Sequence, residues 1–208
     1  MADNLGPALT QLVPMSELTP GAVGAIRNQI INSVVAQVSR ELSLPVDGLV
    51  VRDVRPVGDL QMYQYTTTDA TIECWSYEAT TGSTGFTSVT GAKTMADQRY
   101  VVLFGVRDLR WGWGGCSGAT GAISEVYEIP RVSQIKINVG GADKVIWDIE
   151  SLYAHKNYPV GFTSSGVLIP QNIAFNIYYY RTMTQTDKRL LIQLIGVTVE
   201  PRGKLISP

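Results

Sequence analysis

The stretch VLIPQNIAFNIYYYR, Val167 to Arg181, carries the clearest structural pattern in this chain. After its proline, residues of two kinds alternate. One parity is mostly apolar and consists of Ile173, Phe175, Ile177 and Tyr179. The other parity is more polar and consists of Ala174, Asn176, Tyr178 and Tyr180. Because successive side chains of a strand point to opposite faces, this period of two predicts a strand with one face in a core and one amphipathic face.

Similar strand-like segments fill the chain from about residue 49 onward. They are 49–57, 60–67, 68–79, 99–109, 123–129, 131–139, 144–154, 167–181 and 189–201. In the last segment the apolar parity shifts around Gly196, which predicts a β-bulge there. No helical segment recurs between the strands, so we expect them to pair antiparallel. Eight or nine such strands predict an all-β fold, an antiparallel β-sandwich of the jelly-roll type.

Residues 1–45 have a different character. Residues 1–18 contain two prolines and little periodicity, which predicts an extended arm. Thr19 followed by Pro20 is a helix-start signal, and an amphipathic helix is expected to follow it over about residues 20–43. Its apolar stripe consists of Val23, Ile26, Ile30, Val34, Val38 and Leu42. We therefore expect an arm and helix over residues 1–45 and a sandwich domain over residues 46–208.

The apolar stripe of the helix has two interpretations. In the first, the helix packs on its own domain. In the second, it docks on a partner subunit or a membrane surface, and Ile26, Ile30 and Val34 then form the contact. Only Arg27 and Arg40 provide positive charge on the helix, which disfavours a strongly electrostatic attachment to a membrane.

Composition narrows the classes of function. The chain has 208 residues, of which 45% are hydrophobic, enough for a sizeable core. Charged residues make up 17%, below the usual quarter, and the formal net charge is −1. Lysine and arginine form no cluster, so the electrostatic footprint of a nucleic-acid-binding protein is missing. We expect no direct sequence-specific binding of nucleic acid.

Targeting signals and cysteine spacing add further expectations. No basic-then-apolar segment opens the chain, and no apolar run approaches the ~20 residues that a membrane-spanning helix needs. We therefore expect a soluble protein that is made in the cytoplasm and not exported by a cleaved leader. Cys74 and Cys116 match no zinc-binding spacing. Cys74 is expected to be a small buried hydrophobe, and a bridge between the two cysteines stays open.

Catalytic constellations are hard to assemble from this sequence. The only histidine, His155, lies in a predicted loop, and no G-x-S-x-G motif provides a nucleophile for it. Metal-binding jelly rolls use several histidines. Asp148 and Glu150 would share a strand face roughly 6.5 Å apart. Such a pair could serve glycoside hydrolysis or part of a calcium site, or it could simply belong to a solvated or interface-facing strand surface. We expect no enzyme, no metal and no cofactor.

A glycine-rich loop over residues 110–121 contains Trp111 and Trp113. Two tryptophans in such a loop can form a stacking platform for a sugar or a base. The same loop can instead pack against a neighbouring subunit or cover one end of the sandwich. Trp111 and Trp113 are therefore the candidate residues for a ligand-binding alternative.

The order of segments in the carboxy-terminal half resembles a known family. RVSQIKINVGG, KVIWDIESLYA, PVGF, VLIPQNIAFNIYYYR and a last strand ending in LIGVTVEPRG follow one another. This order is similar to the late strands of single-jelly-roll capsid proteins of icosahedral double-stranded DNA phages and archaeal viruses that enclose an internal membrane. The resemblance covers roughly residues 45–201 and rests on the order of the strands and the residue pattern within them. The chain is too short for a double jelly roll, which implies a partner or a different lattice role, such as a vertex protein.

The resemblance implies a structural virion protein, a capsid or vertex subunit assembled in the host cytoplasm. Its jelly-roll flanks would bind other copies or other capsid proteins, and its arm and helix would clamp a neighbour or touch the internal membrane. Asn176, Tyr178 and Tyr180 are the strand residues expected at such an interface, because tyrosine is favoured where an interface is partly wet. The alternative is a carbohydrate- or receptor-binding β-sandwich that uses Trp111 and Trp113.

Overall fold

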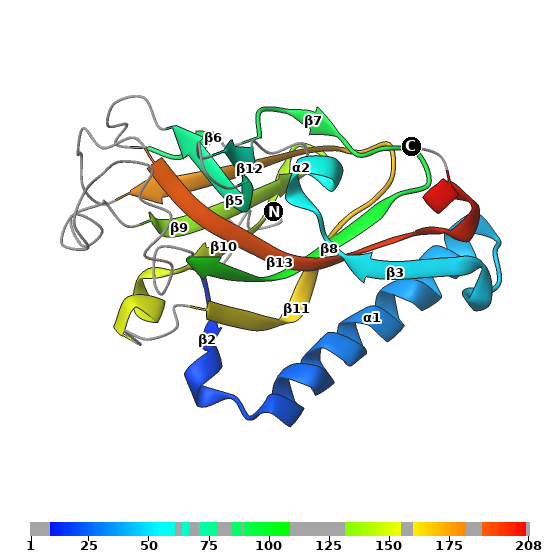
Figure 1. The fold of residues 1–208 in the computed structure, drawn as a ribbon, viewed down its shortest axis with the longest axis horizontal. Helices are drawn as coiled ribbons and strands as arrows, with labels where there is room; N and C mark the ends of the chain where they lie inside the picture. The colour runs from blue at the N-terminus through cyan, green and yellow to red at the C-terminus, as the bar shows by residue number, and fades with distance from the viewer. Residues whose placement is uncertain are drawn as a thin grey trace, which may run out of the picture.

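The computed structural model of the chain describes residues 9–60, 64–66, 71–78, 85–88, 90–108, 132–154, 160–181 and 189–206. These residues form two β-sheets packed as a sandwich, and one long helix, α1 (Pro20–Leu42), lies along the outer side of one sheet (Figure 1). The predicted β-sandwich preceded by a helix is confirmed. No described helix is long and apolar enough to cross a bilayer.

The first sheet, here called the β12 sheet, has the strand order β1-β10-β9-β12-β6, and β7 also pairs with β12. Its strands are β1 (Leu9–Gln11), β6 (Thr87–Ser88), β7 (Lys93–Thr94), β9 (Val132–Val139), β10 (Ala142–Asp148) and β12 (Ala174–Arg181). The second sheet, here called the β13 sheet, has the order β2-β11-β8-β13-β5-β4, and β3 also pairs with β13. Its strands are β2 (Val13–Pro14), β3 (Leu49–Asp53), β4 (Gln64–Thr66), β5 (Thr71–Glu78), β8 (Tyr100–Asp108), β11 (Val160–Ile169) and β13 (Arg189–Pro201). The short helices are α2 (Pro56–Asp59), η1 (Met15–Glu17), η2 (Val46–Gly48), η4 (Glu150–Ala154) and η5 (Arg202–Ile206).

The strands pair in a nested order. β3 pairs with β13, β6 and β7 pair with β12, β8 pairs with β11, and β9 pairs with β10, all antiparallel. Two further antiparallel pairs, β8 with β13 and β9 with β12, join these ribbons into sheets. Among the described strands, β1 alone pairs parallel, at the edge next to β10. The expectation of antiparallel pairing is thus confirmed for the body of the sandwich.

The alternation that predicts β12 is present in the structure. Phe175, Ile177 and Tyr179 are 2%, 2% and 4% exposed and contribute to the core between the two sheets. They lie opposite Val139, Ile137 and Ile135 of β9, which are buried as well. Burial of the same parity on two neighbouring strands fixes the register, because a shift of one residue would turn every apolar side chain outward.

Ile173 is the exception, and its expected place in the core is wrong. The strand begins one residue later, at Ala174, and Ile173 is 37% exposed. The chain turns just before it, where Asn172 adopts a left-handed φ of 57°. The Ile173 carbonyl accepts a hydrogen bond from the Met95 amide at 3.0 Å, so this residue belongs to the turn and not to the ladder with β9.

Helix α1 begins and packs as its sequence predicts. The Thr19 side chain accepts a hydrogen bond from the Ala22 amide at 3.2 Å, and Pro20 occupies the first turn. Its buried side chains are Ile30, Val34, Val35 and Val38. They pack on the outer face of the β13 sheet, against residues that include Val102, Phe104 and Val199. The helix thereby covers one side of the sandwich, and the first of its two interpretations is the one observed (Figure 1).

Gly196 interrupts the ladder between β13 and β8. The register shifts between Ile195 and Gly196, as predicted from the change of apolar parity. A Cβ atom on Gly196 would collide with the carbonyl oxygen of Val102, so glycine lets the two strands approach at the bulge. The bulge returns Val197 and Val199 to the face beneath α1, where both are fully buried.

Candidate functional site

The candidate site is the outer face of the β12 sheet, which presents the second parity of β12. Asn176, Tyr178 and Tyr180 lie there and are each half-buried. They sit opposite the half-buried outward residues of β9, namely Asn138, Lys136 and Gln134. The face is therefore lined mainly with amide and aromatic side chains, and Lys136 is the one cation among these six residues.

Lys136 is the centre of a compact cluster on this face. Its Nζ lies 4.6 Å from the centre of the Phe86 ring and 4.7 Å from the centre of the Tyr178 ring. The same Nζ is 3.2 Å from a carboxylate oxygen of Asp143, and the lysine side chain is only 18% exposed. Tyr180 extends the cluster, because its ring centre lies 5.7 Å from that of Phe86 at 48°. We call Phe86, Lys136, Asp143, Tyr178 and Tyr180 the aromatic–lysine patch.

Asp143 is the charged partner of Lys136 in the patch. A hydrogen bond of 2.8 Å from the Asn138 amide, together with Lys136, holds the pKa of the Asp143 carboxyl below its usual range, although partial burial acts in the opposite direction. Lys136 thus has an anion on one side and aromatic rings on the others. A cation between ring faces is attracted by their quadrupoles. The patch offers fixed aromatic surface with its charges already paired within the chain.

Asn176 has a different part in this face. Its Oδ1 accepts hydrogen bonds from Ser88 Oγ at 2.7 Å and Thr90 Oγ1 at 3.2 Å, and its Nδ2 donates to the Tyr178 hydroxyl at 3.0 Å. Thr90 Oγ1 also accepts a bond from the Ile177 amide at 3.2 Å. These contacts attach the segment around Thr90 to β12. The amide of Asn176 is therefore used within the chain, and Tyr178 and Tyr180 are the residues of the predicted interface that offer ring surface to a neighbour.

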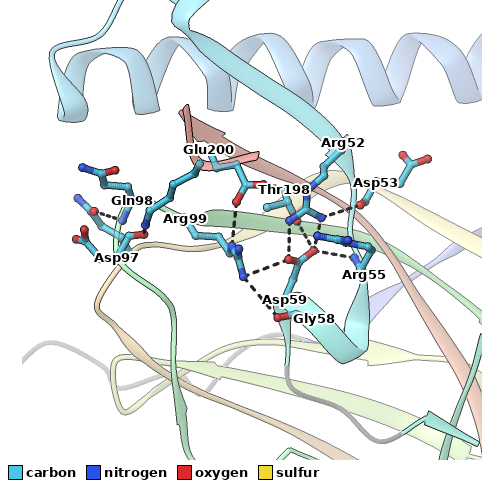
Figure 2. A network of polar contacts seen from close by, with 12 residues as sticks. Arg52, Asp53, Arg55, Gly58, Asp59, Asp97, Gln98, Arg99, Thr198 and Glu200 are labelled. Carbon is cyan, nitrogen blue, oxygen red and sulfur yellow. Dashed lines mark hydrogen bonds and ion pairs between the residues drawn. The ribbon is translucent and has the colours of Figure 1, made fainter. Parts of the chain in front are cut away.

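A second polar cluster lies at the inner face of the β13 sheet, and the sequence patterns do not predict it (Figure 2). It consists of Arg52 on β3, Asp59 on α2, Arg99 just before β8 and Glu200 on β13. Asp59 and Glu200 side chains are 0% and 3% exposed, and those of Arg52 and Arg99 are 17% and 24% exposed. We call these four residues the charge cluster.

Hydrogen bonds close the charge cluster into a ring. Arg52 contacts the two Asp59 oxygens at 2.6 and 2.7 Å and Glu200 Oε1 at 3.0 Å. Arg99 contacts Glu200 Oε2 at 3.0 Å and lies 3.4 Å from Asp59 Oδ1. Thr198 Oγ1 and the Arg55 amide donate to Asp59 Oδ2 at 2.9 and 2.8 Å. Two cations thus face two anions, and all four carboxylate oxygens are occupied.

The electrostatics of the charge cluster indicate a structural role. Burial alone would raise the pKa of Asp59, but hydrogen bonds from Arg52, Arg55 and Thr198 outweigh it and hold that pKa below its ordinary value. The hydrogen bond to Asp59 is the main cause that raises the pKa of Arg52, which stays charged. A carboxylate with a lowered pKa whose oxygens are all paired is a poor general acid or base near neutral pH. The cluster ties together segments that lie up to 148 residues apart in sequence.

The helix residues predicted at an interface lie elsewhere. Ile30 and Val34 are 6% and 7% exposed because they pack on the chain's own β13 sheet, and Ile26 packs partly buried beside them. The partner contact predicted for Ile30 and Val34 is therefore replaced by an internal one. The cause is the outer face of the β13 sheet, which is itself apolar and needs a cover.

The predicted carboxylate pair is also wrong. Asp148 ends β10, but Glu150 already belongs to η4, so the two do not share a strand face. Instead Asp148 Oδ1 accepts a hydrogen bond from the Glu150 amide at 3.1 Å, the contact of a residue that caps a turn. Trp111, Trp113, Cys116 and His155 lie outside the described residues, and so does the side chain of Cys74.

Neither metal-ligand clusters among the described residues nor comparisons with known proteins add a functional assignment to this site. Within the described ranges, no three His, Cys, Asp or Glu side chains gather into a group that could hold a metal ion. Neither the models of protein families, nor the curated proteins, nor the solved structures contain a match to this chain.

Proposed function

We propose that this protein is a structural subunit of a virion shell, folded as a single jelly roll, that associates with further copies or with a second coat protein. The resemblance of the strand order to single-jelly-roll capsid proteins supports a capsid or vertex position in the virion. The protein acts by presenting surfaces to neighbours and not by catalysis.

The nested strand order supports the jelly roll. If β3 is numbered first, β6 with β7 second, and β8 to β13 third to eighth, then the first pairs with the eighth and the second with the seventh. Likewise the third pairs with the sixth and the fourth with the fifth. Wrapping such an antiparallel ribbon yields two four-stranded sheets, here β3-β13-β8-β11 and β6/β7-β12-β9-β10. On this numbering β4 and β5 are an insertion between the first and second strands.

The observation that carries the proposed role is the aromatic–lysine patch on the outer face of the β12 sheet. The outer face of the β13 sheet is covered by α1, whereas Phe86, Tyr178 and Tyr180 keep part of their rings accessible. Aromatic residues are enriched and charged residues are depleted at the centres of protein interfaces. The ion pair of Lys136 and Asp143 is already formed at 3.2 Å, so a partner would not have to neutralise either charge.

Helix α1 contributes a second, more polar surface. Its apolar stripe is used on the β13 sheet, so Asn28, Asn32 and Arg40 are among the residues that remain exposed. Such a face suits a wet contact with a neighbouring subunit better than insertion into a bilayer, which requires a free apolar face. We therefore propose coat proteins as its partners.

Sedimentation velocity and negative-stain electron microscopy of the full chain test the proposal. We expect the wild type to associate with increasing concentration, alone or with its co-expressed coat partner, and Tyr180→Asp to weaken association by placing a charge at the patch. Ala96→Asp is the matched control, because it adds the same charge at an exposed residue between β7 and β8, outside both the patch and the exposed face of α1. A wild type that stays monomeric in both settings would refute the proposed role. Monomers that respond to glycans in tryptophan fluorescence would favour the sugar-binding alternative.

A further inference from the structure

The N-terminal segment from Leu9 to Pro14 joins the edges of both sheets. β1 adds parallel to β10 at the edge of the β12 sheet, with Gln11 opposite Asp148. Two residues later β2 adds antiparallel to β11 at the edge of the β13 sheet, with Val13 opposite Phe162. We call residues 9–14 the edge segment. It closes the same side of the sandwich on which β10 and β11 would otherwise both end a sheet.

Leu12 anchors the edge segment between the two sheets. It is 3% exposed and belongs to the core that also contains Trp147 and Leu152. Gly161 on β11 makes room for it: a Cβ there would lie 2.8 Å from Leu12 Cβ and 2.8 and 2.9 Å from the Leu152 methyl groups. Contacts that short do not occur for real Cβ atoms. The edge between β10 and β11 is thus a groove for an extended segment with one leucine.

The connection from the edge segment to α1 has the properties of a hinge. Five residues separate Pro14 from Pro20, and three of them form the single turn η1, in which no residue is buried. Pro14 and Leu18, on either side of η1, are both extended, with ψ of 140° and 138°. Opening this turn would let five residues span about 17 Å. The edge segment can then leave its own sandwich without unfolding α1.

The edge segment and the first residue of η1 also leave apolar surface in water. Leu9, Val13 and Met15 are 53%, 42% and 43% exposed. They are three of the five large exposed hydrophobic residues in the described part of the chain, and the other two are Val46 and Ile173. Three exposed apolar side chains within seven residues favour a contact with another protein at this edge.

We propose that the edge segment is exchanged between two copies of this chain, so that Leu12 of one copy fills the groove beside Gly161 of the other. This exchange rests on the proposed self-assembly and names the contact that makes it. The groove already fits this sequence, so the same contacts form between copies as within one chain, and only the hinge must open. Copies held together in this way bring the two edges face to face, and Leu9, Val13 and Met15 lie at the new contact.

Cysteine crosslinking between co-expressed copies tests the exchange. Both background cysteines are replaced (Cys74→Ser, Cys116→Ser); one copy then carries Gln11→Cys, and a second copy, with a larger tag, carries Asp148→Cys. The two positions are opposite each other on neighbouring strands and both are accessible. We expect the shortest crosslinker with two thiol-reactive groups, a bis-methanethiosulfonate, to give a covalent heterodimer in the associated fraction. Lys144→Cys in place of Asp148→Cys is the control, because it lies four residues or about 13 Å along the same strand.

A heterodimer with Asp148→Cys but not with Lys144→Cys supports the exchange. The exchange is overturned by two results together. The double variant Gln11→Cys with Asp148→Cys links only within one chain, and the paired single variants give no heterodimer. Electron microscopy of the same samples separates this result from the proposed function. Shells that form without the heterodimer support self-assembly and contradict the exchange. Crosslinked dimers that never form larger assemblies support the exchange and contradict the proposed shell.

Discussion

Removing one charge from the charge cluster should destabilise the protein strongly. Asp59→Asn keeps the shape of the side chain but replaces an anion that receives four hydrogen bonds, two from Arg52 and one each from Thr198 and the Arg55 amide. Arg52 and Arg99 would then share Glu200 alone, and the new amide N–H would face a guanidinium donor. Breaking a buried ion pair by removal of one partner costs about 3–5 kcal/mol. For a chain of this size the loss corresponds to a decrease of about 6–20 °C in Tm.

The assay is urea unfolding followed by circular dichroism, because urea does not screen the ion pairs as a guanidinium salt does. Asp53→Asn is the matched control: it makes the same chemical change six residues earlier, at the end of β3, but the Asp53 side chain is 84% exposed and pairs with Arg27 at the surface. Such a surface pair contributes about 1 kcal/mol or less. If Asp59→Asn costs no more than Asp53→Asn, the charge cluster does not stabilise the fold.

The pH dependence of the same variant provides an independent check of sign. The folded pKa of Asp59 is lowered, so its stabilising contribution is fully present above the unfolded pKa of about 3.9 and is lost as pH falls through the lower folded value. Asparagine does not titrate. The difference in unfolding free energy between wild type and Asp59→Asn should therefore be constant near neutral pH and shrink only in the acid range. A difference that shrinks toward alkaline pH would refute this assignment.

Two further substitution pairs test the packing. Gly161→Ala should cost about 1–3 kcal/mol by overpacking against Leu12 and Leu152, and should raise protease cleavage near the edge segment. Gly24→Ala on α1 should instead stabilise the protein by about 0.5–1 kcal/mol, because a Cβ there meets nothing within 4 Å. Equal effects of the two alanines in thermal unfolding would contradict the groove. Ile177→Ala should cost about 2–5 kcal/mol because Ile177 is 2% exposed in the core. Ile173→Ala should cost well under half as much in the same measurement, and the reverse order would place Ile173 back in the core.

Local patterns predict much of the fold. The alternation over β12 identifies the buried parity because successive side chains must point to opposite faces whatever surrounds the strand. Thr19 and Pro20 predict the start of α1, since the cap satisfies amides within the same turn. Gly196 reveals its bulge through the change of apolar parity. Each of these features depends on residues a few positions apart.

The candidate site is predicted only in part. Tyr178 and Tyr180 can be assigned to the outer face from parity alone. Lys136, Asp143 and Phe86 cannot be attached to them, because that requires the register of β12 with β9 and the course of the chain before β6. Glu200 at the end of an otherwise apolar strand was the one available signal for the charge cluster. Its partners lie 101 and 148 residues away and follow no spacing rule.

The sequence by itself determined that strands follow the long helix, where that helix begins, and which parity of β12 is buried, because these depend on backbone geometry and on the alternation of apolar residues. Tertiary structure alone decided the order of the strands, the burial of the α1 stripe on the chain's own β13 sheet, and the seating of Leu12 beside Gly161. It also decided that Arg52, Asp59, Arg99 and Glu200 form one ring. The physical reason is that a contact between distant segments is stable only when topology and register bring complementary surfaces together, and neither is encoded in any short stretch of residues.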